Sequence, residues 1–362
     1  MLRFFRPNRR RGSANRAPLA NMVQPLEARS LLTGIVTVAI SGQSVTVTGT
    51  DSNDDVEIVF SPDKIAISGD HGTKIKFNGV VSDQADLPNG TVAKDLVVNM
   101  KGGNDMVQIV TDESNGNVRQ IGRDLKIDMG SGNDHLVVST ETGSLSIGGR
   151  LNVTLGAGDD CFIGGQYDAI REALYGDGNP SHDQFRVHGD VSVQGNAGND
   201  KIGLAGMEIG GSLSLDGGDQ NDEMGISDMN IYGKLNVSGG NGNGNDDFAS
   251  ELLNIQGKTT IDMGNGDDRV AFEGGPSGQS QMEVNISMGA GNDRLAIASD
   301  ITVNGKMDGG SGRDQVATYF TLGKLSVKGF EDRTDDQEDK YKVLRNDIGG
   351  DVLNALRLGV QS

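Results

Sequence analysis

Residues 125–138 read Leu-Lys-Ile-Asp-Met-Gly-Ser-Gly-Asn-Asp-His-Leu-Val-Val. Apolar residues alternate with polar ones on both sides of the central Gly-Ser-Gly-Asn-Asp, which is typical of two short β-strands joined by a tight turn. Variants of this turn return along the chain, for example Met-Gly-Ala-Gly-Asn-Asp ending at Asp293. The chain is therefore built from a repeated strand–turn–strand unit.

The aspartate that ends the turn recurs about every 23 residues along most of the chain. Its positions are Asp105, Asp134, Asp160, Asp183, Asp200, Asp222, Asp246, Asp268, Asp293 and Asp314. A weaker copy ends at Asp54, 51 residues before Asp105, a distance close to two repeats. An apolar residue lies two positions after each aspartate, so the turn keeps one register relative to the strand that follows.

Each repeat also contains two further short alternations, as in Leu145-Ser-Ile and Leu151-Asn-Val-Thr-Leu. Three strands and three corners in about 23 residues predict an all-β fold, a right-handed parallel β-helix (β-solenoid) with about three strands per rung. A β-sandwich would instead need hairpins between antiparallel neighbours, and it would not need the same turn at the same phase. The aromatic content of 4% fits a narrow interior with little room for large rings.

The repeat pattern divides the chain into three parts. Residues 1–34 are a basic, aperiodic segment, residues 35–328 form the repeat domain, and residues 329–362 combine an acidic linker with a C-terminal cap or tail. Residues 166–175 have a locally helical pattern, and residues 166–188 are expected to form an outward loop or a bulged side. The chain has no run of about 18 apolar residues, so no transmembrane segment is expected.

The net charge of −19 is unevenly distributed, because residues 1–29 carry seven arginines and one glutamate. The repeat domain is therefore strongly acidic, which argues against nucleic acid as a partner and favours cations. The single cysteine, Cys161, excludes an internal disulfide framework and is expected to be a small buried residue.

The repeated turn has two interpretations. In the first it is a metal-free corner, in which glycine supplies positive φ, aspartate bonds its own backbone, and asparagines such as Asn133 and Asn292 stack in a ladder. In the second it binds a cation, because carboxylates stacked at about 4.8 Å repel one another. Calcium suits such corners, since it accepts about six to eight carboxylate and carbonyl oxygens in flexible geometry.

The corner resembles the calcium-binding RTX, or haemolysin-type, repeat, whose consensus is GGxGxDxUx with U a large apolar residue. Residues 309–316, Gly-Gly-Ser-Gly-Arg-Asp-Gln-Val, match every defined position, whereas Asp105, Asp200 and Asp222 each follow only one of the two inner glycines. The resemblance implies that aspartate side chains and glycine carbonyls bind several Ca²⁺ ions. The candidate ligands are Asp105, Asp134, Asp160, Asp200, Asp222, Asp246, Asp268, Asp293 and Asp314. RTX motifs recur about every nine residues, but this motif occurs once per rung, which implies a single row of sites.

Residues 26–32, Leu-Glu-Ala-Arg-Ser-Leu-Leu, resemble the LEPRxLL motif near the start of many large, repeat-rich exported proteins of planctomycete-type bacteria, with Ala28 in place of proline. The resemblance implies a secreted or cell-surface protein whose partners are polysaccharide or protein outside the cell. The alternative is a disordered basic arm that binds an acidic surface.

Together these features predict an exported, non-enzymatic, calcium-binding β-solenoid with a structural, adhesive or surface-display role. The rival interpretation is a β-helix polysaccharide lyase or hydrolase that uses adjacent carboxylates, such as Asp159 with Asp160 or Asp267 with Asp268. The lack of tryptophan argues against a groove that stacks on sugars, and the four histidines share no metal-ligand spacing.

Overall fold

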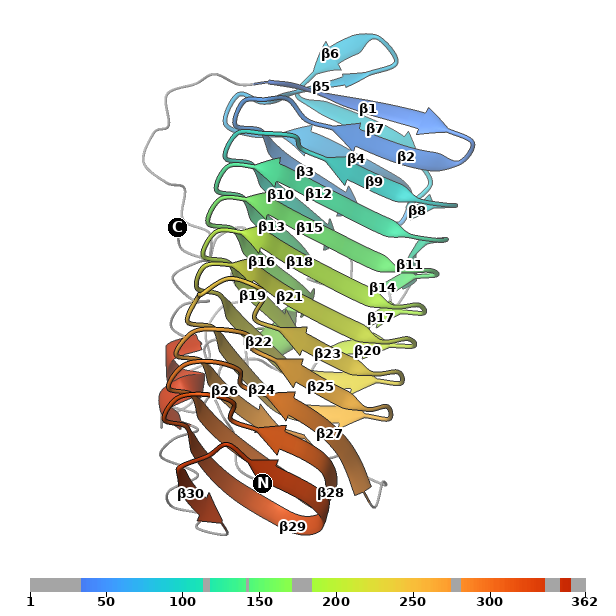
Figure 1. Ribbon diagram of the computed structural model, residues 1–362. Coiled ribbons are helices and arrows are strands. Elements are labelled where there is room, and N and C mark those ends of the chain that lie inside the picture. The colour runs from blue at the N-terminus through green and yellow to red at the C-terminus, as the bar shows by residue number, and fades with distance from the viewer. Residues whose placement is uncertain are drawn as a thin grey trace, which may run out of the picture.

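The chain folds into a rod of stacked β-strands in the computed structural model, which describes residues 34–112, 118–140, 143–170, 184–274, 281–335 and 346–352. Figure 1 shows the strands as successive rungs along one axis. Neighbouring rungs pair through parallel strands in register, so the backbone N–H and C=O groups of one rung bond to those of the next. The predicted all-β parallel solenoid is confirmed.

Each rung has three sides, which we number from the turn that carries the repeated aspartate, here called the aspartate corner. Side 1 begins directly after the aspartate corner, side 2 follows, and side 3 leads to the next aspartate corner. One rung in the middle of the rod consists of β13 (His135–Thr140), β14 (Ser144–Ile147) and β15 (Leu151–Ala157). The predicted three strands per rung are confirmed.

The other strands are assigned to these sides by their pairing. Side 1 also contains β3 (Asp55–Phe60), β10 (Met106–Thr111), β16 (Cys161–Gln166), β19 (Lys201–Ala205), β22 (Glu223–Ile231), β24 (Asp247–Ile255), β26 (Arg269–Glu273), β28 (Arg294–Asp308), β29 (Gln315–Lys328) and β30 (Asp332–Asp335). Side 2 also contains β8 (Thr91–Val92), β11 (Val118–Ile121), β17 (Phe185–Val187) and β20 (Met207–Ile209). Side 3 also contains β2 (Ser44–Thr48), β9 (Leu96–Asn99), β12 (Leu125–Ser131), β18 (Val191–Ala197), β21 (Leu213–Asp219), β23 (Leu235–Ser238), β25 (Thr259–Asp262) and β27 (Gln281–Ser287). The long strands β22 and β24 continue from side 1 to side 2, and β28 and β29 continue from side 1 to side 3.

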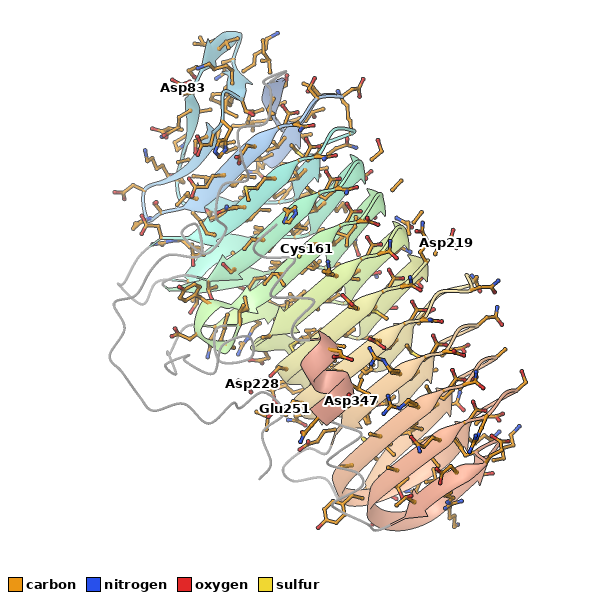
Figure 2. The ribbon with its side chains drawn as sticks, turned by 90° about the vertical axis from the view of Figure 1, so that its left-hand side faces the viewer. Asp83, Cys161, Asp219, Asp228, Glu251 and Asp347 are labelled. Atoms are coloured by element: carbon orange, nitrogen blue, oxygen red, sulfur yellow. The ribbon has the colours of Figure 1, made fainter. Side chains whose placement is uncertain are left out.

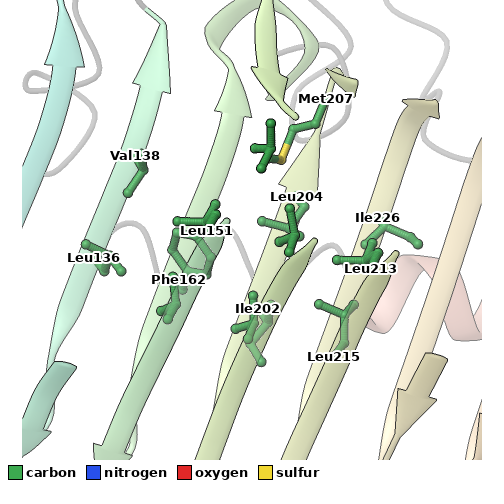
Figure 3. Close-up of a cluster of buried hydrophobic side chains, with 14 of the residues drawn as sticks. Leu136, Val138, Leu151, Phe162, Ile202, Leu204, Met207, Leu213, Leu215 and Ile226 are labelled. Carbon is green, nitrogen blue, oxygen red and sulfur yellow. The ribbon is translucent and has the colours of Figure 1, made fainter. Parts of the chain in front are cut away.

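Apolar side chains stack into columns inside the rod. The column on side 1 runs through Leu136, Phe162, Ile202, Met224, Phe248, Val270, Leu295 and Val316, which pair in register and are buried. Figure 3 shows part of this interior, with Leu136, Phe162 and Ile202 on successive strands. Each of these residues lies two positions after a repeated aspartate, so the predicted inward register is confirmed. Full burial of such a side chain contributes roughly 1.5–3 kcal/mol.

The N-terminal end of the rod departs from the parallel pattern. Here β1 (Ile35–Ser41) pairs with β2, β3 with β4 (Lys64–Gly69), β4 with β7 (Gln84–Pro88), and β5 (Lys74–Phe77) with β6 (Val80–Ser82), all antiparallel. The backbone N–H of Asp54 donates to Oδ1 of Asp105 at 2.7 Å, so these aspartates lie on adjacent rungs. The prediction of two repeats between them was wrong, because the additional residues form antiparallel strands.

Asp160 and Asp200 are likewise on adjacent rungs. The backbone N–H of Asp160 donates to Oδ1 of Asp200 at 2.9 Å, across 40 positions in sequence. Phe185 pairs with Leu145 on side 2 and is not part of the side 1 column. The prediction of a separate rung at Asp183, which itself lies outside the described residues, was therefore wrong. Residues 167–170 of the expected insertion are helical, and residues 171–183 lie outside the described part of the chain.

The C-terminal part of the chain adds to the rod and then turns onto its surface. Strand β30 pairs with β29, so the solenoid continues to Asp335, beyond the boundary expected at residue 328. A helix over residues 346–352 lies along side 1, as Figure 2 shows. Its Ile348 and Val352 are fully buried in one cluster with the outward-facing Ala271 and Ala296. The small alanine side chains let the helix approach the sheet closely.

Two ion pairs hold this helix on side 1. Asp347 bonds Arg294 at 2.9 Å, and Asp351 bonds Arg269 at 2.6 Å. All four side chains are partly exposed, so each pair contributes on the order of 1 kcal/mol or less. The apolar contact of Ile348 is therefore the larger contribution to docking.

The search for membrane-spanning helices covered the described residues, and none of their helices has the length and apolar character that a bilayer requires.

Candidate functional site

The aspartates of the aspartate corner form one continuous row along the rod, which we call the inner ladder. The backbone N–H of each aspartate donates to Oδ1 of the aspartate one rung closer to the C-terminus. The row runs through Asp54, Asp105, Asp134, Asp160, Asp200, Asp222, Asp246, Asp268, Asp293 and Asp314, with N···O distances of 2.7–3.0 Å. Glu331 ends the row, because its Oε2 accepts the N–H of Asp314 at 2.7 Å. The structure thus brings all nine candidate metal ligands together.

The residues directly before these aspartates form a second row of opposite polarity, the outer ladder. Here the side-chain Oδ1 accepts the backbone N–H of the following rung, as from Asn133 to Asn104 at 3.0 Å and from Asp159 to Asn133 at 3.1 Å. The row comprises Asn53, Asn104, Asn133, Asp159, Asn199, Asn221, Asn245, Asp267 and Asn292, and it ends at the N–H of Arg313. The expected stack of asparagines is present, and it satisfies a second backbone N–H in each rung.

The adjacent carboxylates of the enzyme hypothesis belong to different ladders. Asp160 is buried and bonded within the inner ladder, whereas Asp159 is exposed and bonded within the outer ladder. Asp267 and Asp268 are divided in the same way. In each pair one carboxylate is thus buried within the inner ladder and the other lies at the surface.

The glycines of the corner are required by the close approach of successive rungs. A Cβ added at Gly156, where φ is +124°, would lie 1.9 Å from the carbonyl oxygen of Gly130 in the preceding rung. A Cβ added at Gly158, where φ is +134°, would lie 2.0 Å from the carbonyl oxygen of Gly132. Both positions need positive φ and open space, which glycine alone provides without strain.

Three corners lack one of these glycines and keep the same backbone. The glycine positions are occupied by Lys101, Asn196 and Gln220, whose φ angles are 74°, 76° and 77°. A residue with a side chain in this left-handed region carries strain of order 1 kcal/mol. The backbone of the corner is therefore set by the stacking of the rungs, even where the local sequence disfavours it.

In the corner of Asp246 the first glycine lies six residues before the aspartate, two more than in the other corners. A Cβ added at Gly240 would lie 1.8 Å from the carbonyl oxygen of Gly218, which is the contact made by the first corner glycine elsewhere. Gly240 therefore takes this role, although Gly242 has the expected spacing of four residues from Asp246.

The second carboxylate oxygen of the inner ladder is buried and has no hydrogen-bond partner on most rungs. This applies to Oδ2 of Asp105, Asp134, Asp160, Asp200, Asp222, Asp268, Asp293 and Asp314. The same side chains are at most 2% exposed. A buried oxygen without a donor costs about 1–3 kcal/mol and more if it is charged. Most rungs thus have a carboxylate oxygen that a proton or a cation would stabilise.

Burial raises the pKa values of these carboxyl groups far above the usual range. Loss of hydration is the largest cause at Asp222, whose pKa is raised to about 9, and at Asp134, whose pKa is raised to about 7. The N–H bond to each carboxylate opposes this shift, and neighbouring ladder carboxylates add to it at Asp105 and Asp160, whose pKa values are about 8. The inner ladder therefore binds protons more tightly than the same residues do in the unfolded chain.

A second group of possible metal ligands was not singled out from the sequence. The ligand atoms of Asp55, Asp70 and His71 lie within 4.8 Å of one another, and His71 Nδ1 lies 2.5 Å from Asp55 Oδ2. This bond raises the pKa of His71. Antiparallel pairing of β3 with β4 brings these residues together. Asp55 is distant in sequence from Asp70 and His71, so no local sequence motif predicts the group. Asp70 and His71 are exposed, and the group has the character of a surface ion pair.

The single cysteine has the structural role expected from the sequence. Cys161 is 5% exposed and belongs to the same apolar cluster as Ile163 and Ile170. Burial raises the pKa of its thiol to about 12, so the nucleophilic thiolate is suppressed at neutral pH.

Searches of protein-family models, of curated proteins and of solved structures find no match to this chain.

Proposed function

We propose that this protein is an exported, non-enzymatic β-solenoid that binds calcium along its inner ladder and serves as a structural, adhesive or surface-display module. The observation that carries the proposal is the buried carboxylate oxygen without a donor that recurs on successive rungs. Carboxylates stacked at about 4.8 Å repel one another, and calcium accepts both carboxylate and backbone carbonyl oxygens. The residues that would hold the ions are the nine aspartates from Asp105 to Asp314.

The export and surface parts of the proposal rest on sequence and charge. Residues 26–32, which resemble the LEPRxLL motif, lie outside the described residues. The acidic repeat domain and the extended rod suit a spacer or a surface that meets other molecules outside the cell, where calcium is abundant. A tagged full-length chain should be recovered from the cell surface or the medium, and its retention in the cytoplasm would refute this part.

A metal-free solenoid is the second candidate, and a specific observation favours it. Oδ1 of each carboxylate already accepts a backbone N–H, and the raised pKa values allow Oδ2 to be neutralised by a proton. In that case the ladder is a set of hydrogen-bonded carboxylic acids and needs no ion.

A calcium titration of the thermal melt separates the two candidates. Calcium-bound solenoid should melt at a higher temperature at pH 8, with a shift that rises with calcium concentration as mass action requires. Magnesium is the control, because its strict octahedral geometry suits these corners poorly. An unchanged melting temperature and no calcium in the dialysed protein would establish the metal-free solenoid.

A further inference from the structure

The C-terminal end of the rod forms a step. Strand β29 runs along side 1 and then side 3, and β30 adds a further strand on side 1 only. Side 1 is therefore one rung taller than side 3 at this end, where β29 and β30 lie at the bottom of Figure 1. We call β30 the upper step, and residues 321–328 of β29, which lie on side 3, the lower step.

Each step has an unpaired strand edge. The upper step pairs with β29 on one edge, the lower step pairs with β28 on one edge, and no other strand of the described residues pairs with either of them. The docked helix over residues 346–352 lies away from this end, because its partners Arg294 and Arg269 are two and three rungs from β30. An unpaired edge presents N–H and C=O groups that the strand of another chain can bond.

The apolar interior is partly open at the lower step. On the preceding rungs of side 3, Ile261, Ile286 and Met307 form one inward column and are at most 1% exposed. Val327 continues this column and is only partly buried. Leu325 also packs against the core and is partly buried. A second molecule that covered these side chains would gain hydrophobic stabilisation.

The N-terminal end of the rod offers less to a second chain. Its outermost strand on side 1 is β7, whose Ala85 and Leu87 are 5% and 2% exposed. Pro88 in the same strand has no N–H to donate to a further strand. The outermost strand on side 3, β6, is only three residues long. Of the two ends, the C-terminal one therefore has the longer unpaired edge.

The two steps have opposite charges on their outward faces. The lower step carries the exposed Lys324 and Lys328, and the upper step begins with the exposed Asp332, which pairs in register with Gln315. A two-fold axis through the aspartate corner, perpendicular to the rod, would exchange sides 1 and 3 between two copies. Each upper step would then fill the missing rung above the lower step of the other copy, with opposite charges in adjacent positions.

We propose that this protein forms a two-fold dimer, joined end to end at the C-terminal step, in which the upper step of each copy pairs antiparallel with the lower step of the other. Arg333 has the inward register beyond Val316, and its methylene stem would cover Leu325 and Val327 of the second copy while its charged head stays in water. The dimer is a rod of twice the length with an N-terminal end at each tip. The inference is independent of calcium binding.

Charge reversal with rescue tests the dimer, with all proteins full-length and in chelator. In analytical ultracentrifugation at micromolar concentration, the wild type should have twice the monomer mass of 38.0 kDa. Lys324→Glu and Asp332→Lys should each weaken dimerisation about tenfold or more, because each places like charges together at both steps. An equimolar mixture of the two variants should restore the dimer, since each step then joins opposite charges. The control Asp83→Lys, at the exposed N-terminal end, should stay dimeric.

Every other outcome overturns the proposal. Monomeric wild type at all concentrations would exclude the dimer, and assemblies that grow beyond a dimer would indicate head-to-tail stacking instead. A mixture that stays monomeric, or dissociation by Asp83→Lys, would reject the pairing of the two steps. If circular dichroism shows that a variant fails to fold, hydrogen exchange of the wild type decides: amide protection of residues 323–328 and 332–335 should fall on dilution, and unchanged protection would reject the interface.

Discussion

The inner ladder predicts that neutralising a single buried carboxyl removes part of the pH dependence of stability. The test substitution is Asp134→Asn, measured in the presence of a chelator so that only protons neutralise the ladder. Asp134 is 1% exposed and its pKa is raised from 3.8 to about 7. Because the folded state binds this proton more tightly than the unfolded state, the stabilisation is present at low pH and is lost as pH rises toward 7.

The magnitude follows from the two pKa values. Between pH 5 and pH 8.5 the folded carboxyl ionises, whereas the unfolded carboxyl is already ionised at pH 5. The interval from pH 5 to a folded pKa of about 7 spans two pH units, and at about 1.36 kcal/mol per unit it corresponds to about 3 kcal/mol. From pH 5 to pH 8.5 the free energy of unfolding of Asp134→Asn should therefore fall by about 3 kcal/mol less than that of the wild type.

Urea unfolding followed by circular dichroism at pH 5 and pH 8.5 measures this difference. Asp128→Asn is the matched control, because Asp128 lies on the adjoining strand β12 and points to solvent. The control should retain the pH dependence of the wild type. Equal pH dependence in Asp134→Asn and the wild type would refute the reasoning, since it would mean that the buried carboxyl does not bind its proton more tightly in the folded state.

Three further substitutions probe the corner and the docked helix. Gly156→Ala should destabilise the rod by about 3 kcal/mol or more in urea unfolding, because the added Cβ would lie 1.9 Å from the carbonyl oxygen of Gly130. The control is Gly350→Ala, which should not destabilise the protein, because nothing lies within 4 Å of a Cβ added there. Gln220→Gly should raise the melting temperature, because Gln220 has φ of 77° and glycine would relieve about 1 kcal/mol of backbone strain there. A lower melting temperature would mean that the backbone at Gln220 is not strained. Ile348→Asp should release the helix over residues 346–352, because Ile348 is 0% exposed, and amide hydrogen exchange in that helix should rise sharply while the rungs stay protected.

The local features of the rungs could be predicted from the sequence because they depend on short-range chemistry. Alternation such as Leu125, Ile127 and Met129 identified inward positions, and all three are buried. Glycines such as Gly156 identified a corner that needs positive φ. The candidate aspartates were found for the same reason, since each ends a turn with a defined spacing.

The neighbours of each rung could not be predicted from local pattern alone. Spacing suggested a rung at Asp183, but the chain from Asp160 to Asp200 closes a single rung with an insertion. The 51 residues from Asp54 to Asp105 also form one step, with antiparallel strands between them. Pairing between rungs depends on backbone register and on packing of the interior columns. A rung can carry additional residues outside the rod without a change in either, so the spacing between aspartates does not give the number of rungs.

The sequence by itself determined the repeat, the inward columns and the glycine corners, because strand alternation and positive φ are properties of a few adjacent residues. Only the tertiary structure decided that the aspartates stack into a buried ladder and that the preceding residues stack with opposite polarity. Those features depend on how one rung lies upon the next. Burial and the hydrogen bonds between rungs are created by stacking, and no single repeat contains them.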